Sequence, residues 1–272
     1  MSTATITQDD TIGTTNPAQE PPVDLSTMPR ISLWRLTRVE LRKMADTRSG
    51  KWLLIGIAVV TLMVIVAFYA SVDPAERTFF SFMAAANGPQ GLLLPVLGIL
   101  LVTSEWSQRT ALVSFTLTPM RGRVLRAKFL SALVAGMAAI VIAVLLASVA
   151  TIIGGSDNAW AMVGVDDLGK VVLLQVTGVI QGLAFGLLFL NSSAAIVSYF
   201  VLPSALTIVG TLWDSLHQVR PWIDLWAAQD PLFRGGGDLT GEQWAQSVTS
   251  TLIWVVLPLA IGLVRVLRAE VK

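Results

Sequence analysis

Residues Trp52–Ala70 read WLLIGIAVVTLMVIVAFYA, an apolar run that contains no charged side chain. A helix needs about 20 such residues to cross the hydrocarbon core of a bilayer, which is roughly 30 Å thick. The whole chain has the same character, since 54% of its 272 residues are hydrophobic and only 14% are charged. Soluble domains carry about 25% charged residues. We therefore predict that the chain is an integral membrane protein.

Four more segments are long and apolar enough to be transmembrane helices. They are Phe129–Ile153, Val171–Leu190, Ala194–Trp213 and Thr249–Leu267. One further segment is weaker, because its clean apolar run, Gly91–Val102, has only 12 residues. A helix from Pro89, a residue type favoured in the first helical turn, to Trp106 would still measure about 27 Å. The prediction is an all-α fold with six transmembrane helices, and the alternative is a re-entrant second segment.

The basic residues are distributed unevenly over the connecting segments. Fifteen of the 19 lie in alternate segments: seven before the first helix, five between the second and third, and three near the C-terminus. Cytoplasmic segments carry the excess of Lys and Arg. Both ends of the chain are therefore expected in the cytoplasm, and the protein in the plasma membrane. This sorting requires the weak second segment to cross, because otherwise the two richest basic clusters would face opposite sides.

Residues 1–30 are polar, rich in Thr and Pro, and contain no apolar run. A secretory signal peptide would need such a run. We predict a disordered cytoplasmic tail over residues 1–30 and a single six-span domain over residues 31–272.

Composition and motifs exclude several kinds of site. The chain has no cysteine, which excludes disulfides and thiolate chemistry, and its net charge of +1 gives no reason to expect a nucleic-acid partner.

Gly164–Lys170 matches the first seven positions of a phosphate-binding loop, but Val171 stands where a Ser or Thr must hold Mg²⁺. Asp166 and Asp167 are expected in a solvated loop. We therefore expect no catalytic residue, and no cofactor or metal bound by this chain itself.

The predicted helices contain no ionisable residue away from their ends. Ion-driven transporters usually need such residues at membrane depth, so their absence argues against ion coupling. Mild polar residues such as Gln175, Gln181 and Tyr199 are present instead. They are expected either to form hydrogen bonds between helices or to line a weakly polar path for an apolar or amphipathic substrate.

The fourth predicted helix contains Gly178, Gly182 and Gly186, each four residues from the next. Small residues at this spacing share one helix face and let another backbone approach closely. We expect this face to pack within the subunit or at a dimer interface.

Two basic segments are expected on the cytoplasmic side. Ser32–Thr47 is predicted to be an amphipathic helix in the membrane interface. Its apolar face would consist of Leu33, Trp34, Leu41, Met44 and Ala45. Residues 104–128 read SEWSQRTALVSFTLTPMRGRVLRAK and combine a basic cluster with a Pro-Met-Arg-Gly turn. This loop is expected to dock a cytoplasmic partner; for both segments the alternative is a basic flank that only sets topology.

Two runs resemble membrane subunits of ATP-binding-cassette exporters of the type-2 permease family: VELRKMADTRSGKW at 39–52 and LLVTSEWSQRTALVSFTLTPMRGRVLRAKFL at 100–130. The resemblance extends over roughly residues 32–267. It is strongest at Glu40, Lys43, Thr47, Arg48, Glu105, Arg109, Thr110, Arg121, Arg123 and Lys128. It implies an elbow helix over Ser32–Thr47 and a coupling element over roughly Trp106–Arg123.

The resemblance also implies roles for particular residues. The elbow helix would use Trp34, Glu40, Lys43 and Arg48. The candidate coupling residues are Glu105, Arg109, Arg121, Arg123 and Arg126. A long outer loop, Asp214–Ser247, would contain short helices, and Thr240 with Gln243 is predicted to cap the helix that leads into the sixth span.

The function implied is that of a permease subunit that exports an apolar or amphipathic substrate with ATP hydrolysed by a separate ATPase subunit. Two permeases would pair, as a homodimer or with a second permease. The alternatives are an ion-coupled secondary transporter and a non-transporting membrane scaffold or sensor subunit.

Overall fold

Six helices in the computed structural model are long and apolar enough to cross a membrane. The model describes residues 31–107, 120–160, 164–213, 216, 218–234 and 239–268, and these ranges contain no β-strand. The six are α2 (Arg48–Ser71), α3 (Phe79–Ser107), α5 (Arg121–Gly154), α6 (Val165–Phe189), α7 (Ser192–Leu212) and the run Gly241–Arg268. The predicted all-α fold with six such helices is therefore confirmed.

The sixth of these runs has three parts: α10 (Gly241–Thr251), a π-helical turn (Leu252–Val256) and α11 (Leu257–Arg268). Shorter elements are α1 (Leu33–Asp46), a 3-10 turn at Pro74–Glu76, α8 (Arg220–Ile223) and α9 (Leu225–Arg234). All the helices belong to one unit that begins at Leu33. The predicted tail, residues 1–30, lies outside the described residues.

The second long helix begins earlier than predicted. α3 begins at Phe79 rather than Pro89, and Pro89 lies inside the helix. Asn87 and Gly88 interrupt the apolar run in the sequence, but the preceding turns are buried, and Phe82 and Met83 pack against α2 and α5 side chains. With 29 residues, α3 is about 43 Å long at 1.5 Å per residue, so a full crossing is possible.

The third and sixth long helices also extend beyond the predicted limits. α5 begins at Arg121 rather than Phe129, so the basic residues from Arg121 to Lys128 form helical turns instead of a loop. The last run begins at Gly241 rather than Thr249. Its predicted cap is confirmed, because the Gln243 backbone N–H donates to Thr240 Oγ1 at 3.2 Å and the Gln243 side chain accepts from the Thr240 N–H at 2.9 Å.

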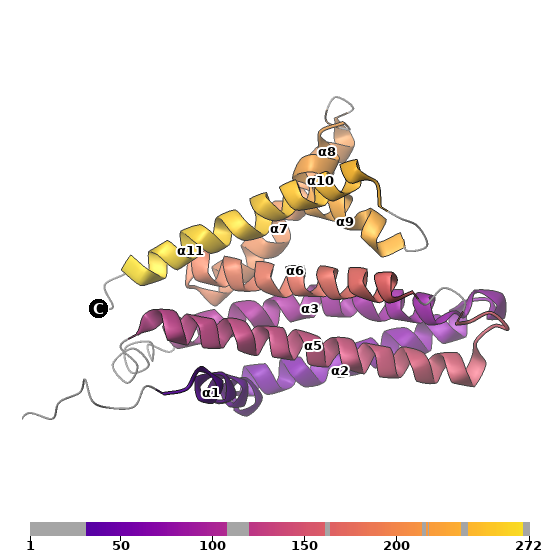
Figure 1. The fold of residues 1–272 in the computed structure, drawn as a ribbon, viewed down its shortest axis with the longest axis horizontal. Coiled ribbons are helices and arrows are strands. Elements are labelled where there is room, and N and C mark those ends of the chain that lie inside the picture. Colours follow the sequence, from indigo (N-terminus) through magenta and orange to yellow (C-terminus); the bar gives the residue numbers. More distant parts are fainter. Residues whose placement is uncertain are drawn as a thin grey trace, which may run out of the picture. The chain divides into compact units, whose positions relative to one another are not determined.

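The helices α3 and α6 pack closely side by side (Figure 1). A Cβ atom added at Gly182 would lie 2.1 Å from the Pro95 carbonyl oxygen, and one at Gly186 would lie 3.2 Å from Ile99 Cα. A Cβ atom at Gly178 would make an ordinary 3.5 Å contact with Pro95. The glycine face of α6 therefore packs against α3 within this chain.

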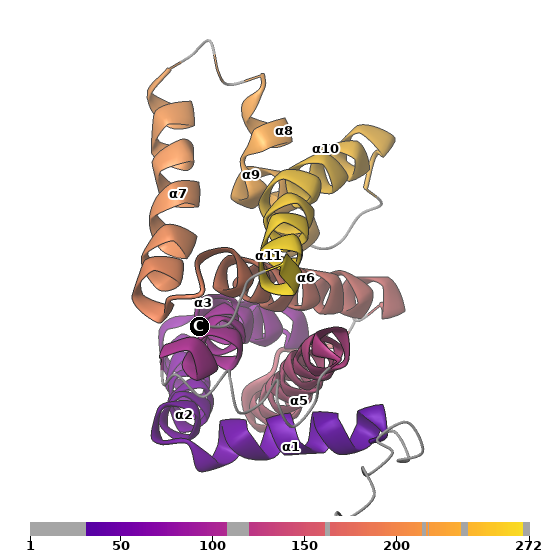
Figure 2. The same ribbon diagram turned by 90° about the vertical axis from the view of Figure 1, so that its left-hand side faces the viewer.

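The short helix α1 runs crosswise to α2 and α5, near one end of both (Figures 1 and 2). A tight turn at Thr47 joins α1 to α2, where the Thr47 side chain accepts a hydrogen bond from the Gly50 N–H at 3.3 Å. A Cβ atom at Gly50 would lie 2.1 Å from the Met44 carbonyl oxygen. The turn is thus tight enough to require glycine there.

Short helices also occur within the predicted outer loop. The carboxylate of Asp224 accepts hydrogen bonds from the Trp226 and Ala227 N–H groups and so caps α9. It also accepts from Thr207 Oγ1 at 2.9 Å and from Arg220 at 3.2 Å. These contacts tie α8 and α9 to α7.

Candidate functional site

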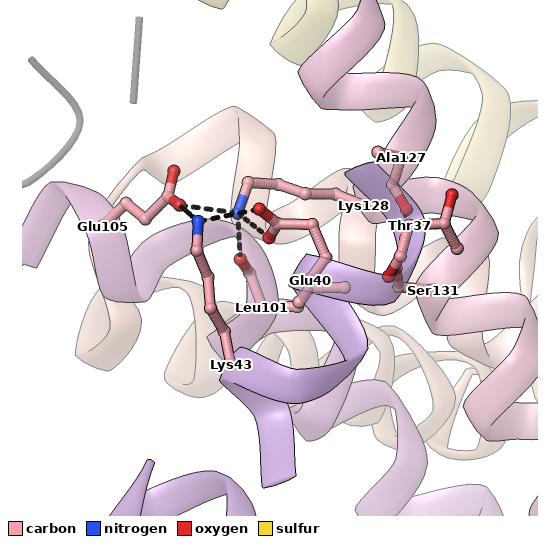
Figure 3. A network of polar contacts seen from close by, with 8 residues as sticks. All are labelled: Thr37, Glu40, Lys43, Leu101, Glu105, Ala127, Lys128 and Ser131. Carbon is pink, nitrogen blue, oxygen red and sulfur yellow. Dashed lines mark hydrogen bonds and ion pairs between the residues drawn. The ribbon is translucent and has the colours of Figure 1, made fainter. Parts of the chain in front are cut away.

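Four charged side chains from three helices meet in a buried cluster (Figure 3). Glu40 and Lys43 come from α1, Glu105 from the end of α3 and Lys128 from the third turn of α5. We call this group the charge cluster. These four residues are among those that carry the resemblance described above, and the fold brings them together from segments up to 88 residues apart.

Lys128 lies at the centre of the charge cluster. Its ammonium group donates to Glu40 Oε2 at 2.7 Å and to the Leu101 carbonyl oxygen at 3.1 Å, and it lies 3.2 Å from Glu105 Oε1. An ammonium group has three N–H donors, so these three acceptors satisfy it. The side chains of Lys128 and Glu40 are only 5% and 6% exposed, so their ion pair is shielded from water.

Lys43 closes the charge cluster on its more exposed side. Its ammonium group lies 2.8 Å from Glu40 Oε1 and 2.8 Å from Glu105 Oε1. Partial burial opposes the charged form, but the hydrogen bonds and charges of Glu105 and Glu40 outweigh it and raise the pKa of Lys43 above its ordinary value. Two lysines and two glutamates together carry no net charge, which allows the group to be buried.

A further hydrogen bond beside the charge cluster joins α1 to α5. Ser131 Oγ lies 2.7 Å from the carbonyl oxygen of Ala127 in its own helix and 3.1 Å from that of Thr37 in α1, so its one hydroxyl hydrogen is shared between the two acceptors (Figure 3). Thr37, Glu40 and Met44 form the buried face of α1. Trp34 and Ala45 of the predicted apolar face do not pack against the rest of the chain, whereas Glu40 is buried within it. Glu40 is buried because Lys128 of α5 and Lys43 of α1 pair with its carboxylate, whereas hydrophobicity alone would place it outside.

The remaining predicted elbow and coupling residues lie apart from the charge cluster. Trp34 is exposed, with the Arg38 guanidinium 5.7 Å from its ring centroid, and Arg48 is exposed in the first turn of α2. Arg121 donates to the Val266 carbonyl oxygen at 3.2 Å and so joins the start of α5 to α11.

Two other candidates lie on the same helix as Arg121. Arg123 is half-buried and Arg126 is exposed. Arg109, and most of the predicted coupling element, lie outside the described residues.

The segment with the partial phosphate-loop pattern is helical. Gly164 precedes α6, and Asp166 and Asp167 occupy its first turn, so the predicted solvated loop is wrong here. Lys170 forms an ion pair with Asp167 at 3.0 Å, one turn along the helix. Within the described part of the chain, no group of three His, Cys, Asp or Glu side chains is placed to hold a metal ion.

Sequence reasoning recognised the members of the charge cluster but not their contact. Glu40 and Lys43 are spaced to meet on one helix turn, which is a local signal. The sequence predicts a loop at Lys128, because the apolar run that follows it begins at Phe129. Nothing in the sequence indicates that Lys128 turns toward Glu40 rather than toward solvent.

The sequence was compared with protein-family models and with curated proteins. The sequence matches none of the protein-family models with which it was compared, and no curated protein matches it. The charge cluster joins three helices through its ion pairs. Its geometry serves to hold α1, α3 and α5 in one arrangement.

Proposed function

We propose that this chain is the permease subunit of an ATP-binding-cassette exporter of the type-2 permease family. It moves an apolar or amphipathic substrate across the plasma membrane with ATP hydrolysed by a separate ATPase subunit. Both ends of the chain are cytoplasmic in this proposal, α1 is the elbow helix, and residues 106–123 form the coupling element. Two permeases pair, either as identical copies or with a second permease.

The charge cluster is the observation that carries the proposal. Glu105 and Lys128 lie on the two helices that flank residues 108–119, the middle of the proposed coupling element. A partner that displaces this element moves the ends of α3 and α5. Because Lys128 and Glu105 are bonded to Glu40 and Lys43, α1 moves with them. A charge-free contact between these helices would slide more easily, since apolar contacts are not directional.

The positions of the charges favour this function over an ion-coupled transporter. In the described parts of the six long helices, every ionisable side chain lies within about eight residues of a helix end. Lys128 is the eighth residue of α5, which has 34 residues, whereas about 20 suffice to cross the hydrocarbon core. Lys128 therefore has room to lie at the membrane boundary.

The experiment is co-purification of the chain with co-expressed candidate ATPase subunits that carry a complete phosphate-binding loop. The double variant Arg121→Gln with Arg123→Gln removes two basic residues of the proposed coupling element and is expected to lose ATPase binding. The matched control, Arg42→Gln with Lys51→Gln, removes two exposed basic residues elsewhere and should retain it. Because Arg121 also contacts Val266, the unfolding temperature of each variant is measured as well.

Unchanged co-purification together with unchanged ATPase stimulation in the Arg121 and Arg123 variant would contradict the proposal. Transport driven by an imposed ion gradient in ATP-depleted vesicles would establish the secondary transporter instead.

A further inference from the structure

Two buried amide side chains, Asn87 of α3 and Gln181 of α6, have no hydrogen-bond partner among the residues that the structure describes. They are only 5% and 4% exposed. The neighbouring amides are paired: Gln175 donates to Gln90 at 2.9 Å, and Gln90 donates to the Ala139 carbonyl oxygen at 3.0 Å. Among the described residues, Thr61 Oγ1 is the one fully buried side-chain polar atom without a partner, so the amide atoms of Asn87 and Gln181 remain accessible to a small molecule such as water. Internal bonding therefore accounts for one pair of amides and not for the other.

Both unpaired amides line one small cavity between α3, α6, α7 and α9. Its other polar lining residues are Gln175, Tyr199 and Gln229, and no Asp, Glu, Lys, Arg or His lines it. The volume is about 40 Å³. A water molecule needs about 10–15 Å³ on this measure, so the cavity has room for a single hydroxyl or amide group, or for a few waters. We call it the amide cavity.

A larger apolar cavity adjoins the amide cavity. Leu174 and Gln229 line both of them. The second cavity has a volume of about 220 Å³ and lies between α6, α9 and α10, where Leu232 and Trp244 are among its lining residues, none of which is charged. An apolar cavity of about 150 Å³ accommodates benzene. The apolar cavity thus accepts a group somewhat larger than one aromatic ring.

We propose that the two cavities together bind an uncharged amphiphile, with a hydroxyl or amide group on Asn87 and Gln181 and an apolar group beside Trp244. An amide side chain both donates and accepts, so it can pair with either kind of polar group. A charged group is disfavoured, because no opposite charge lines either cavity. This inference rests on the proposed function, because it identifies the substrate of the proposed exporter as a neutral amphiphile.

The test uses 3-(4-bromophenyl)-1-propanol as the probe and the purified full chain in phosphatidylcholine nanodiscs. Bromine quenches tryptophan fluorescence on contact, and Trp226 and Trp244 line the amide and apolar cavities respectively. We expect quenching that saturates, and that is lost when both tryptophans are changed to Phe. The carboxylate and amine analogues, which carry a charge, should bind about tenfold more weakly or worse.

The double variant Asn87→Leu with Gln181→Met removes the unpaired amides and replaces them with apolar side chains of similar length. It should weaken binding of the alcohol about tenfold or more, and its unfolding temperature should stay the same or rise, because no internal hydrogen bond is lost. The matched control is Gln90→Met on the same helix, which breaks two internal bonds. It should lower the unfolding temperature.

Three results would overturn the inference: quenching that rises linearly with probe concentration as for simple partition into lipid, equal affinity in the double variant, or unfolding of the double variant. The measurement requires no ATPase. If the chain binds the probe but does not pair with an ATPase, the binding site is supported and the exporter function is refuted. If it pairs with an ATPase but does not bind the probe, the exporter function is supported and the binding site is refuted.

Discussion

Two of the buried polar groups of helix α3 differ in how completely they are bonded. Near its C-terminal end, Glu105 belongs to the charge cluster and lies within 3.2 Å of two lysines. Eighteen residues earlier, about 27 Å along the helix, Asn87 faces the amide cavity without a partner. Satisfied buried charges hold helices in one arrangement, whereas unsatisfied amides leave hydrogen-bonding capacity for a ligand. The same helix thus has a C-terminal end that is fixed by ion pairs and an earlier segment whose amide can bind a ligand.

Removal of Lys128 should have the largest effect, because it leaves Glu40 and Glu105 buried without their central partner. We expect Lys128→Met to lower the free energy of unfolding by about 3–5 kcal/mol, the usual cost of breaking a buried ion pair. The measurement is reversible unfolding in mixed detergent micelles. Lys51→Met, at an exposed lysine, is the control and should change stability by less than about 0.5 kcal/mol. A similar small loss in Lys128→Met would show that the charge cluster holds nothing together.

The next prediction separates the charge cluster from the amide cavity by changing only the surroundings of the amide cavity. Gly182→Ala places a methyl group against the Pro95 carbonyl oxygen and should push α6 away from α3 beside Gln181. We expect a loss of about 1–3 kcal/mol from overpacking and a loss of probe binding in the amide cavity. Gly169→Ala, on the same helix in open space, should be neutral or gain up to about 1 kcal/mol. Equal stability in both variants would contradict the close packing of α3 and α6.

A third prediction compares paired and unpaired amides directly. Gln90→Met should cost about 1–3 kcal/mol, because it leaves buried partners unbonded. Asn87→Leu, three residues away, should cost nothing or stabilise the protein. Unfolding free energies of the two variants in the same detergent mixture provide the measurement. A larger loss in Asn87→Leu than in Gln90→Met would reverse the comparison.

The smallest expected effect is a pH dependence at Lys43. The pKa of Lys43 is raised from its ordinary value of 10.5, so its ion pairs stabilise the fold fully below that pH. The stabilisation disappears as the pH rises through the folded-state pKa. The lysine side chain is 43% exposed, so solvent screens much of the effect. Unfolding temperatures between pH 9 and 12 should fall more for the native chain than for Lys43→Met, and parallel curves would refute this contribution.

Much of the fold could be predicted because its signals are local. An apolar run such as Trp52–Ala70 predicts a spanning helix by length alone, and the Thr240 cap depends on residues three positions apart. The start of α3 could not be predicted in this way. Asn87 interrupts the apolar pattern there, and only contacts with α5 and α2 show that the preceding turns are buried.

The candidate sites show the same division between local and distant information. The residues Glu40, Lys43, Glu105 and Lys128 stood out in the sequence, but their pairing did not. The sequence does not single out Asn87, because the predicted helix begins after it, at Pro89. The glycine spacing in α6 predicted a packing face, and the structure shows that α3 is what packs against it.

By itself, the sequence determined that this is a multi-pass membrane protein with six long apolar helices, since hydrophobic length is a property of each segment alone. Only the tertiary structure decided which buried polar groups are satisfied. A charge or an amide finds its partner across segments that are tens of residues apart, as Lys128 finds Glu40. The packing of the helices determines which of these groups come into contact. The residue pattern within either segment does not predict that contact.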